Sequence, residues 1–211
     1  MTRAAASHAA VVLAAGASRR LGRPKQLLTR DGETLLHRAA RLAAASGALR
    51  SVVVLGARRE AMQAAVAGLD VECVFNPDWE QGLSSSLRAA ARALEDFDGP
   101  VLVLGCDQPA LDGAHLSALI AGASWSPGAC AATVHGGALG IPALIPAALW
   151  RQSTGLHGDR GFGAALARQL PGAVWRLQAP ELEWDLDTPG DVAVAIERGW
   201  IDADQAAVPG V

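Results

Sequence analysis

The feature that most constrains the fold is an alternation of short apolar runs with segments of helical spacing. The apolar runs are Ala9–Ala14 (AAVVLA), Ser51–Leu55 (SVVVL), Val71–Phe75 (VECVF) and Val101–Gly105 (VLVLG). Runs that are almost continuously apolar are typical of strands buried on both faces of a parallel sheet. The residues just after each run are therefore expected at one edge of the sheet, where open α/β sheets bind their ligands.

Helical segments separate these runs, as the crossovers of a parallel sheet require. In residues 33–47 leucines and alanines recur at helical spacing, and Gly47 can end the helix in a left-handed conformation. Residues 59–68 and 84–94 predict two further helices. The first half of the chain therefore predicts repeated βαβ units, in a Rossmann-like, doubly wound and mostly parallel α/β sheet.

The pattern changes beyond Gly128. Residues 129–145 predict two strands around a Gly-Gly turn, and short helices near 146–151 and 161–170 lead to a strand at 173–178. We expect this region to form a small antiparallel insertion that rims a pocket.

Residues 181–199 predict a strand that turns into a helix. Thr188 is the expected N-cap, Pro189 the first helical residue, and Asp191 the residue that closes a capping box. We expect residues 1–200 to form a single domain and residues 201–211 to be a loosely ordered tail.

Composition excludes several classes of protein. The 211 residues are 51% hydrophobic and carry a net charge of −3, which favours one domain with no general attraction for nucleic acid or anionic membranes. The three cysteines are far apart, so a zinc site or disulfide framework is not expected. No apolar stretch approaches the roughly 20 residues that cross a bilayer. We expect a cytoplasmic protein.

The N-terminal residues also imitate a secretion signal, because Arg3 precedes small apolar residues that continue to LAAGAS. Ser7 and His8 interrupt this apolar stretch, and cleavage after it would remove the first predicted strand. We therefore expect the segment to belong to the mature protein.

A basic, glycine-containing loop follows the first predicted strand. The small residues Ala14, Ala15 and Gly16 let a ligand approach the backbone, while Arg19 and Lys25 can neutralise phosphate oxygens. The spacing fits neither a Walker loop nor a dinucleotide fingerprint. The loop predicts a polyanion site, and the alternative is a surface loop with solvated arginines.

Acidic residues complete this constellation. Asp107 directly follows the strand that ends at Gly105, and Asp185 and Asp187 are two apart on a predicted strand, which places them on one side of it. Magnesium prefers a few carboxylates together with phosphate oxygens and water. The alternatives are that Asp107 caps the following helix or turn and that Asp187 serves only the turn before Thr188.

Five segments resemble, in order and across nearly the whole chain, the nucleotidyltransferases that act on molybdopterin. Within this MobA-like NTP transferase family they look most like the molybdenum cofactor cytidylyltransferases. The first segment is shared with many nucleotide-sugar pyrophosphorylases, and the second and fourth narrow the resemblance. The segments are LAAGASRRLGRPKQLL, NPDWEQGLSSSL, GCDQP, HGDRGFGAAL and DLDTPGD.

The resemblance implies a role for each matched residue. Catalytic roles fall to Lys25, Arg19 and Asp107. Nucleotide-binding roles fall to Leu13, Ala14, Ala15, Gly16, Arg19, Lys25, Asn76, Gly82, Ser84 and Asp107. Acceptor-binding roles fall to Ser85, Ser86, Gly158, Asp159, Arg160 and Gly161. The implied metal ligands are Asp107, Asp185 and Asp187, with Mg²⁺ as cofactor. Leu83 and Ile141 depart from the family pattern on the acceptor side.

The implied reaction is attack by the terminal phosphate of molybdopterin on the α-phosphorus of CTP, with release of pyrophosphate. CTP is favoured over GTP because the stretch from Leu13 to Gly16 reads LAAG, whereas guanylyl-transferring relatives resemble LAGG. An ionised phosphate needs no protein base, and His37 and His115 lie in helical patterns. A molybdoenzyme or a cofactor chaperone is the implied protein partner. Two alternatives stay open: a nucleotidyltransferase for sugar phosphates or other small phosphates, and a non-catalytic nucleotide-binding chaperone or regulator.

Overall fold

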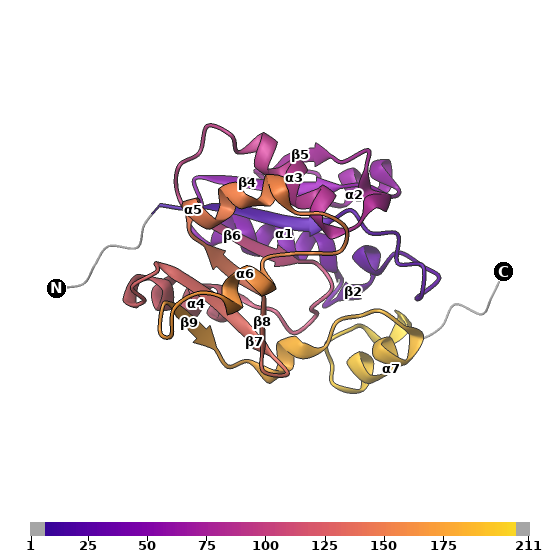
Figure 1. Cartoon of the computed structure of the whole chain (residues 1–211). Helices are drawn as coiled ribbons and strands as arrows, with labels where there is room; N and C mark the ends of the chain where they lie inside the picture. The colour runs from indigo at the N-terminus through magenta and orange to yellow at the C-terminus, as the bar shows by residue number, and fades with distance from the viewer. Residues whose placement is uncertain (1–6, 206–211) are drawn as a thin grey trace.

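A single mixed sheet forms the centre of the molecule in the computed structural model, which describes residues 7–205 (Figure 1). Its strand order is β5-β4-β1-β6-β8-β7-β9. The strands are β1 (Ala9–Ala14), β4 (Arg50–Leu55), β5 (Glu72–Phe75), β6 (Val101–Gly105), β7 (Cys130–His135), β8 (Ala138–Ile145) and β9 (Val174–Leu177). A separate antiparallel pair joins β2 (Thr29–Arg30) to β3 (Glu33–Thr34). The predicted doubly wound α/β fold is confirmed.

Strand β1 lies at the centre of the parallel part of the sheet. Val12 is opposite Val53 on β4 and Leu104 on β6. Because the three strands run in parallel, the loops after Ala14 and after Gly105 leave the sheet at the same edge. This register brings the basic loop and Asp107 together.

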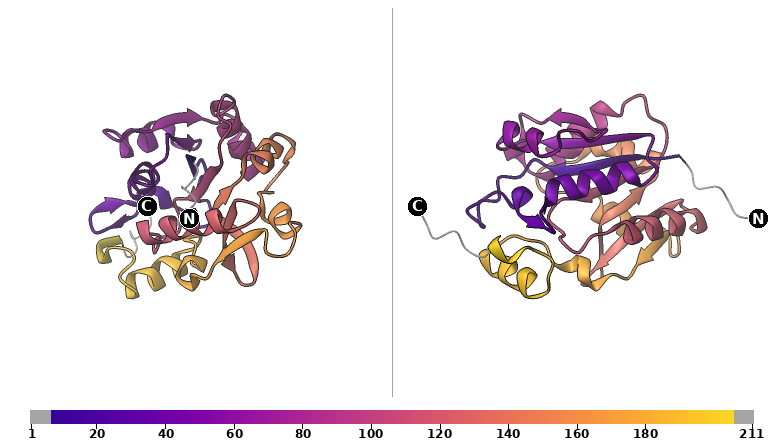
Figure 2. Two further views of the ribbon diagram at one scale, coloured as in Figure 1. Left: turned by 90° about the vertical axis from the view of Figure 1, so that its left-hand side faces the viewer. Right: turned by 180° about the vertical axis from the view of Figure 1, so that it is seen from behind.

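Helices cover both faces of the sheet, as the two views in Figure 2 show. Val12 and Leu104 face a core with α1, α2 and α4, whereas Val11 and Val103 face a core with α3, α5 and α6. The helices are α1 (Leu35–Ala45), α2 (Arg59–Ala65), α3 (Leu83–Ala93), α4 (Gly113–Trp125), α5 (Ala147–Trp150), α6 (Gly163–Ala167) and α7 (Pro189–Glu197). No helix in residues 7–205 is long and apolar enough to cross a membrane.

The predicted antiparallel insertion is the hairpin of β7 and β8, whose turn at Gly136 and Gly137 has φ values of 53° and 87°. Residues that carry a side chain rarely adopt such φ values, which explains why two glycines stand at this turn. Strand β8 also pairs antiparallel with β6, so the hairpin extends the main sheet. Strand β9 then pairs parallel with β7.

The strand expected at the start of residues 181–199 is absent. A 3₁₀ turn, η4 (Pro180–Glu183), leads instead into a loop that carries Asp185 and Asp187. The backbone of this loop bonds to the end of the sheet where Leu186 N donates to Asp107 O, at 3.0 Å. Proline lacks the N–H that a continuing ladder would use, which favours the turn. The predicted capping box of Thr188 and Asp191 on α7 is confirmed.

The chain after α7 returns to the first loop. Ile201 is buried in a small third core with leucines of the basic loop, and Asp202 accepts hydrogen bonds from the backbone of Asp31 and Gly32 at 2.7 and 2.9 Å. The structure of residues 201–205 therefore differs from the loose tail that we expected. These contacts arise because the apolar face of α7 already packs on that loop. Residues 206–211 lie outside the described part of the chain.

Candidate active site

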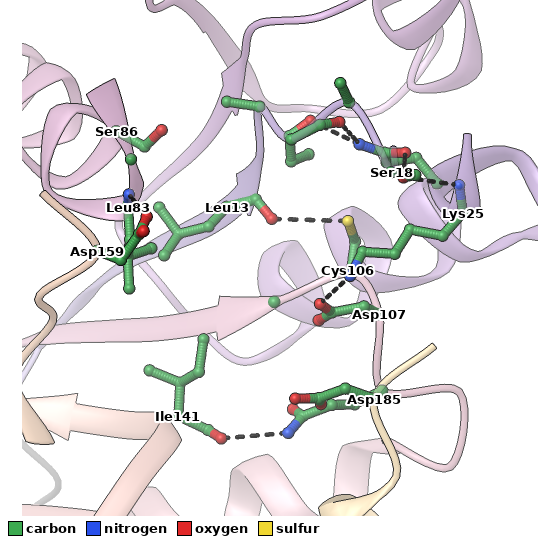
Figure 3. A pocket seen from close by; sticks show the side chains of 18 of the residues that line it. Leu13, Ser18, Lys25, Leu83, Ser86, Cys106, Asp107, Ile141, Asp159 and Asp185 are labelled. Atoms are coloured by element: carbon green, nitrogen blue, oxygen red, sulfur yellow. Dashed lines mark hydrogen bonds and ion pairs between the residues drawn. The ribbon is translucent and has the colours of Figure 1, made fainter. Parts of the chain in front are cut away.

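A pocket of about 680 Å³ opens where β1 and β6 end (Figure 3). Its volume is in the range of small-molecule sites. The structure brings many of the sequence-predicted site residues into its wall: Leu13, Ala14, Ala15, Gly16, Arg19, Lys25, Gly82, Ser86, Asp107, Asp159 and Asp185.

The loop after β1 is folded around a buried glutamine, Gln26. Its Nε2 donates to the carbonyls of Ala14 and Gly16, at 3.2 and 2.6 Å, and its Oε1 accepts from Ser18 Oγ at 3.2 Å. Ser18 Oγ also accepts from the backbone N–H of Lys25 at 3.1 Å. These bonds fix the loop in one conformation next to the end of the strand. We did not predict Gln26, because nothing in the sequence distinguishes it from a solvated loop residue.

Lys25 lies between two carboxylates. Its Nζ is 2.8 Å from Asp107 Oδ2 and 2.9 Å from Asp187 Oδ1, and its side chain is 15% exposed. Burial alone would lower the pKa of Lys25, but the charges and hydrogen bonds of the two aspartates outweigh it and raise the pKa. Lys25 is therefore a permanent cation. An ammonium has three N–H donors, so one remains for a ligand in the pocket.

Asp185 and Asp187 have different environments although they are two residues apart. Solvent in the pocket reaches Asp185, but protein on its other sides and the nearby charge of Asp107 raise the pKa of Asp185 to about 7. Burial would also raise the pKa of Asp187, but Lys25 and Arg20 hold it below the usual range. Arg20 Nη2 lies 2.6 Å from Asp187 Oδ2. Asp187 is thus paired with two protein cations, whereas Asp185 has no cationic side chain within ion-pair distance in the described part of the chain.

Arg19 lies at the rim of the pocket. Its side chain is 74% exposed, pairs with Glu80 and lies 5.7 Å from the ring centre of Trp79. Arg19 is therefore accessible to an anion in the pocket. Binding of that anion would replace the ion pair between Arg19 and Glu80.

The predicted residues around α3 divide into wall and support. Asn76 is fully buried, and its Nδ2 donates to Ser85 Oγ and Ser86 Oγ at 2.8 and 3.1 Å. Ser84 and Ser85 are also buried and do not line the pocket. Of the three serines, only Ser86 reaches the wall. The structure thus brings Asn76, Ser84 and Ser85 beneath the site rather than into it.

Residues 158–161, which we expected on the acceptor side, pack against the start of α3. Ser84 N donates to Gly158 O at 3.0 Å, and Leu83 N donates to Asp159 Oδ1 at 3.3 Å. A Cβ on Gly82 would lie 2.4 Å from that carboxylate oxygen, so only glycine fits there. Asp159 lines the pocket, whereas Gly158, Arg160 and Gly161 do not.

Sequence reasoning missed part of the wall. Cys106 is buried, and its Sγ lies 3.6 Å from the carbonyl oxygen of Leu13. Burial raises the pKa of this thiol to about 12, so the thiol stays protonated. The other unpredicted lining residues include Ser18, Gln26, Trp79, Gln108, His135, Gly140 and Glu183. Leu83 and Ile141, the two departures from the family pattern, both line the pocket.

No group of three or more His, Cys, Asp and Glu side chains in residues 7–205 is arranged as a complete metal-binding cluster. The pocket instead offers the separate carboxylates of Asp107 and Asp185. A cation held here would need further ligands from a substrate or water.

Curated proteins match about half of this chain. Nicotine blue oxidoreductase from Paenarthrobacter nicotinovorans is 41% identical over 102 residues, which are 48% of this chain and 50% of that protein. The bifunctional protein GlmU from Rhodococcus opacus is 38% identical over 53% of this chain and 24% of that protein. This chain therefore spans half or less of the length of the curated relatives that it matches.

Solved structures match over nearly the whole chain. The homologue of Mycobacterium tuberculosis Rv0371c from Mycobacterium sp. strain JC1 has a TM-score of 0.76 at 28% identity, covering 91% of this chain and 96% of that one. The complex of M. tuberculosis Rv0371c with manganese has a TM-score of 0.71 at 26% identity, covering 90% and 98%. The model of the MobA-like NTP transferase domain matches residues 10–174, so the chain belongs to the MobA-like NTP transferase family.

Proposed function

We propose that this protein is a nucleotidyltransferase that transfers CMP from CTP to the terminal phosphate of molybdopterin. The observation that carries the proposal is the convergence of Lys25, Asp107 and Asp185 on one pocket at the ends of β1 and β6. A buried permanent cation next to carboxylates suits a triphosphate and its divalent metal.

In this reaction an oxygen of the acceptor phosphate forms a bond to the α-phosphorus of CTP. The bond between the α-phosphorus and its bridging oxygen to the β-phosphorus breaks, and pyrophosphate leaves with the electron pair. Lys25 donates its remaining N–H to a phosphate oxygen, and Arg19 exchanges Glu80 for the triphosphate at the rim. Charge neutralisation and alignment of this kind account for most of the catalysis of phosphoryl transfer.

The residues fit a divalent cation, for which we propose Mg²⁺. Asp107 and Asp185 would be the ligands, because both oxygens of Asp187 pair with cations, Lys25 and Arg20, whereas only one oxygen of Asp107 pairs with Lys25. Few carboxylates plus phosphate oxygens and water form the usual magnesium environment. When bound, the cation supplies positive charge where the transferred phosphoryl group accumulates negative charge.

The reaction needs no protein base, since the attacking phosphate is already ionised near neutral pH. His135 is the histidine that lines the pocket, and its Nε2 lies 2.7 Å from the carbonyl oxygen of Ile141. Nε2 therefore carries the hydrogen that it donates to this carbonyl, which leaves Nδ1 as the nitrogen of the neutral ring with a lone pair.

The experiment incubates the purified protein with each nucleoside triphosphate, Mg²⁺ or Mn²⁺, and either molybdopterin or sugar phosphates, and measures pyrophosphate release. We expect release with CTP and molybdopterin, and loss of release in Lys25→Met. Faster turnover with sugar phosphates would favour the sugar-phosphate alternative. Nucleotide binding without release from any acceptor would favour the non-catalytic alternative and overturn the proposal.

The name of one relative suggests a second candidate, a redox reaction, because that oxidoreductase is 41% identical over 102 residues. A parallel assay of NADH oxidation with dye acceptors separates the two. Turnover of NADH without pyrophosphate release would replace the proposed transferase with an oxidoreductase.

A further inference from the structure

The carboxylates of Asp107 and Asp185 come from two segments that are far apart in the sequence. Asp107 follows β6, whereas Asp185 lies in the loop after η4. Leu186 N donates to Asp107 O at 3.0 Å, which joins the two backbones. One hydrogen bond fixes one point of a loop but leaves its orientation open. Other contacts must therefore set where the carboxylate of Asp185 lies.

Gln108, the residue after Asp107, makes a buried contact between these segments. Its side chain belongs to a residue that is 7% exposed, and its Nε2 donates to the carbonyl oxygens of Leu182 in η4 and Ile141 on β8, at 2.9 and 3.3 Å. Burial raises the pKa of Asp185, and the amide of Gln108 is close enough to act against that rise. One amide therefore joins the end of β6, the turn before Asp185 and the hairpin.

The partners of this side chain require hydrogen-bond donors. Both carbonyl oxygens only accept, and the NH₂ group of a glutamine has two N–H donors. The other end of the amide, Oε1 of Gln108, is buried and has no hydrogen-bond partner among the described residues. An unpartnered buried acceptor costs stability. The orientation of the amide is therefore set by the contacts of Nε2.

The segment that carries Gln108 is held from another side by two arginines. Arg30 Nη1 donates to Pro109 O at 2.7 Å, and Arg38 Nη2 donates to Leu111 O at 3.3 Å. Arg38 and Gln108 also line a cavity of only about 10 Å³. A space of this size holds at most one water molecule, which leaves the amide little room to rotate. Gln108 thus reaches η4 from a fixed position.

Two further hydrogen bonds hold η4 nearer the surface. His115 Nε2 lies 2.8 Å from Glu181 Oε1, and Gly136 N donates to Glu183 Oε1 at 2.9 Å. The side chain of Glu181 is 41% exposed, and the bond to Glu183 is exposed as well. Solvent weakens such contacts, so the buried amide of Gln108 is the firmer connection.

We propose that Gln108 is a positioning residue, which sets Asp185 next to Asp107 by holding the carbonyl oxygen of Leu182. This inference rests on the proposed function, in which both carboxylates bind one divalent cation. A shared cation needs both ligands at a defined separation, because Mg²⁺ tolerates little departure from its preferred geometry. Loss of the amide would release η4 from the end of β6 and let Asp185 move away from Asp107.

The test measures the position of the segment and the binding of metal separately. Hydrogen–deuterium exchange of residues 181–187 is followed by mass spectrometry in the metal-free protein. Mn²⁺ is titrated with and without CTP, while electron paramagnetic resonance reports the free ion. Gln108→Met keeps the length of the side chain but removes its donors. Gln108→Asn keeps the amide on a shorter side chain and serves if the first variant folds poorly.

The control is Ser126→Ala. Ser126 is buried, and its Oγ donates to the backbone carbonyl of Cys130, the first residue of β7, at 2.9 Å. The start of β7 lies at the opposite edge of the sheet from the pocket. This variant therefore also loses a buried hydrogen bond from a side chain to the backbone, but away from Asp107 and Asp185.

We expect both Gln108 variants to speed exchange in residues 181–187 and to weaken Mn²⁺ binding in the presence of CTP about tenfold, which corresponds to one well-formed hydrogen bond. Ser126→Ala should lower the melting temperature and change neither readout. Unchanged Mn²⁺ affinity in the Gln108 variants overturns the inference. Weaker affinity without faster exchange also overturns it, because Gln108 would then act on the cation directly.

The same measurements separate this inference from the proposed function. Wild-type protein that binds no Mn²⁺ would refute the metal of the proposed function, and the inference with it. Binding of Mn²⁺ that depends on Gln108, without pyrophosphate release from any acceptor, would refute the transferase reaction alone. Pyrophosphate release with Mn²⁺ affinity that is independent of Gln108 would refute the inference alone.

Discussion

Asp107 lies where β6 ends and contacts the ammonium of Lys25. Asp107→Asn keeps the size of the side chain but removes its charge, so the variant loses both the proposed metal ligand and one of the two carboxylates that pair with Lys25. We predict that it folds normally and that pyrophosphate release falls about 100-fold or more. Circular dichroism and the release assay check this, with the exposed Asp70→Asn as control. Turnover near the wild-type rate would refute the metal assignment.

Ala15 is 6% exposed and packs where Gly56 and Trp79 meet, as the close approach of their atoms indicates. Ala15 lines the pocket near the end of β1, and in the proposed cytidylyl transfer its methyl group would occupy space that a larger purine could use. One methyl group is worth roughly 1–3 kcal/mol of discrimination, so we predict a preference for CTP over GTP of about ten- to a few hundred-fold. Ala15→Gly should weaken this preference without reversing it. Measurement of kcat/KM for both nucleotides decides; equal wild-type values would refute the cytidylyl assignment.

At the residue scale, the sequence indicated the edge of the sheet where the site residues meet. Asp107 closely follows β6, and Lys25 and Asp185 also line the pocket because the loops that carry them are anchored at this edge. Ser84 and Ser85 could not be judged in this way, because whether a serine on α3 points into the pocket or beneath it depends on the rotation of the helix. That rotation is set by packing between elements distant in the sequence.

At the scale of elements, the β2–β3 pair is tied to α1 by Glu33. Both of its oxygens accept from Arg41, at 2.8 and 2.7 Å, and Oε1 also contacts His37. The hydrogen bonds from Arg41, which have the largest effect, and the contact with His37 lower the pKa of Glu33 from 4.5 to about 2, although burial acts in the opposite direction. The carboxylate thus stays ionised in the folded protein at pH values where the unfolded chain is protonated.

A lowered pKa stabilises the fold above the unfolded value and loses that effect as pH falls. We predict that Glu33→Gln reduces the free energy of unfolding by about 1–2 kcal/mol at neutral pH. This value already allows for the solvent that screens the partly exposed Arg41. The difference from wild type should shrink between pH 4.5 and about 2. Urea unfolding across this range measures it, with Glu60→Gln as control. A difference that is constant with pH would contradict the ion-pair explanation.

Two elements show where sequence patterns are insufficient. Asp31 and Gly32 form the turn between β2 and β3 with φ values of 56° and 75°, a recognisable hairpin signal, but strands of two residues carry no periodicity. The predicted strand before Asp185 is a 3₁₀ turn and a loop. Its sequence favoured a strand, but Pro180 offers no N–H to a ladder, and no strand of the described residues pairs with this segment.

At the scale of the whole molecule, the end of the described chain supports its beginning. The third core joins Leu21 and Leu28, which flank Lys25 in the sequence, to residues near Asp187 and after α7. These residues are Leu186, Val192 and Ile201. Lys25 and Asp187 are themselves in contact. We predict that Ile201→Ala lowers the free energy of unfolding by about 2–4 kcal/mol and also raises KM for CTP. Ile145→Ala, in a different core, is the control that should lower stability without changing KM. An unchanged KM in Ile201→Ala would show that the third core does not position Lys25.

The antiparallel pairing of β8 with β6 has a consequence for how such proteins diversify. The hairpin that bears His135 and Ile141 pairs with β6 through β8, and Gln108 Nε2 donates to the backbone carbonyl of Ile141, whereas Lys25 and Asp107 follow strands on the other side of the pairing. Because these contacts use the backbone of the hairpin, its side chains can change while the strands before Lys25 and Asp107 stay in place. A lineage built on this sheet can acquire a new acceptor while retaining its reaction, and directed evolution toward one should randomise residues 135–141.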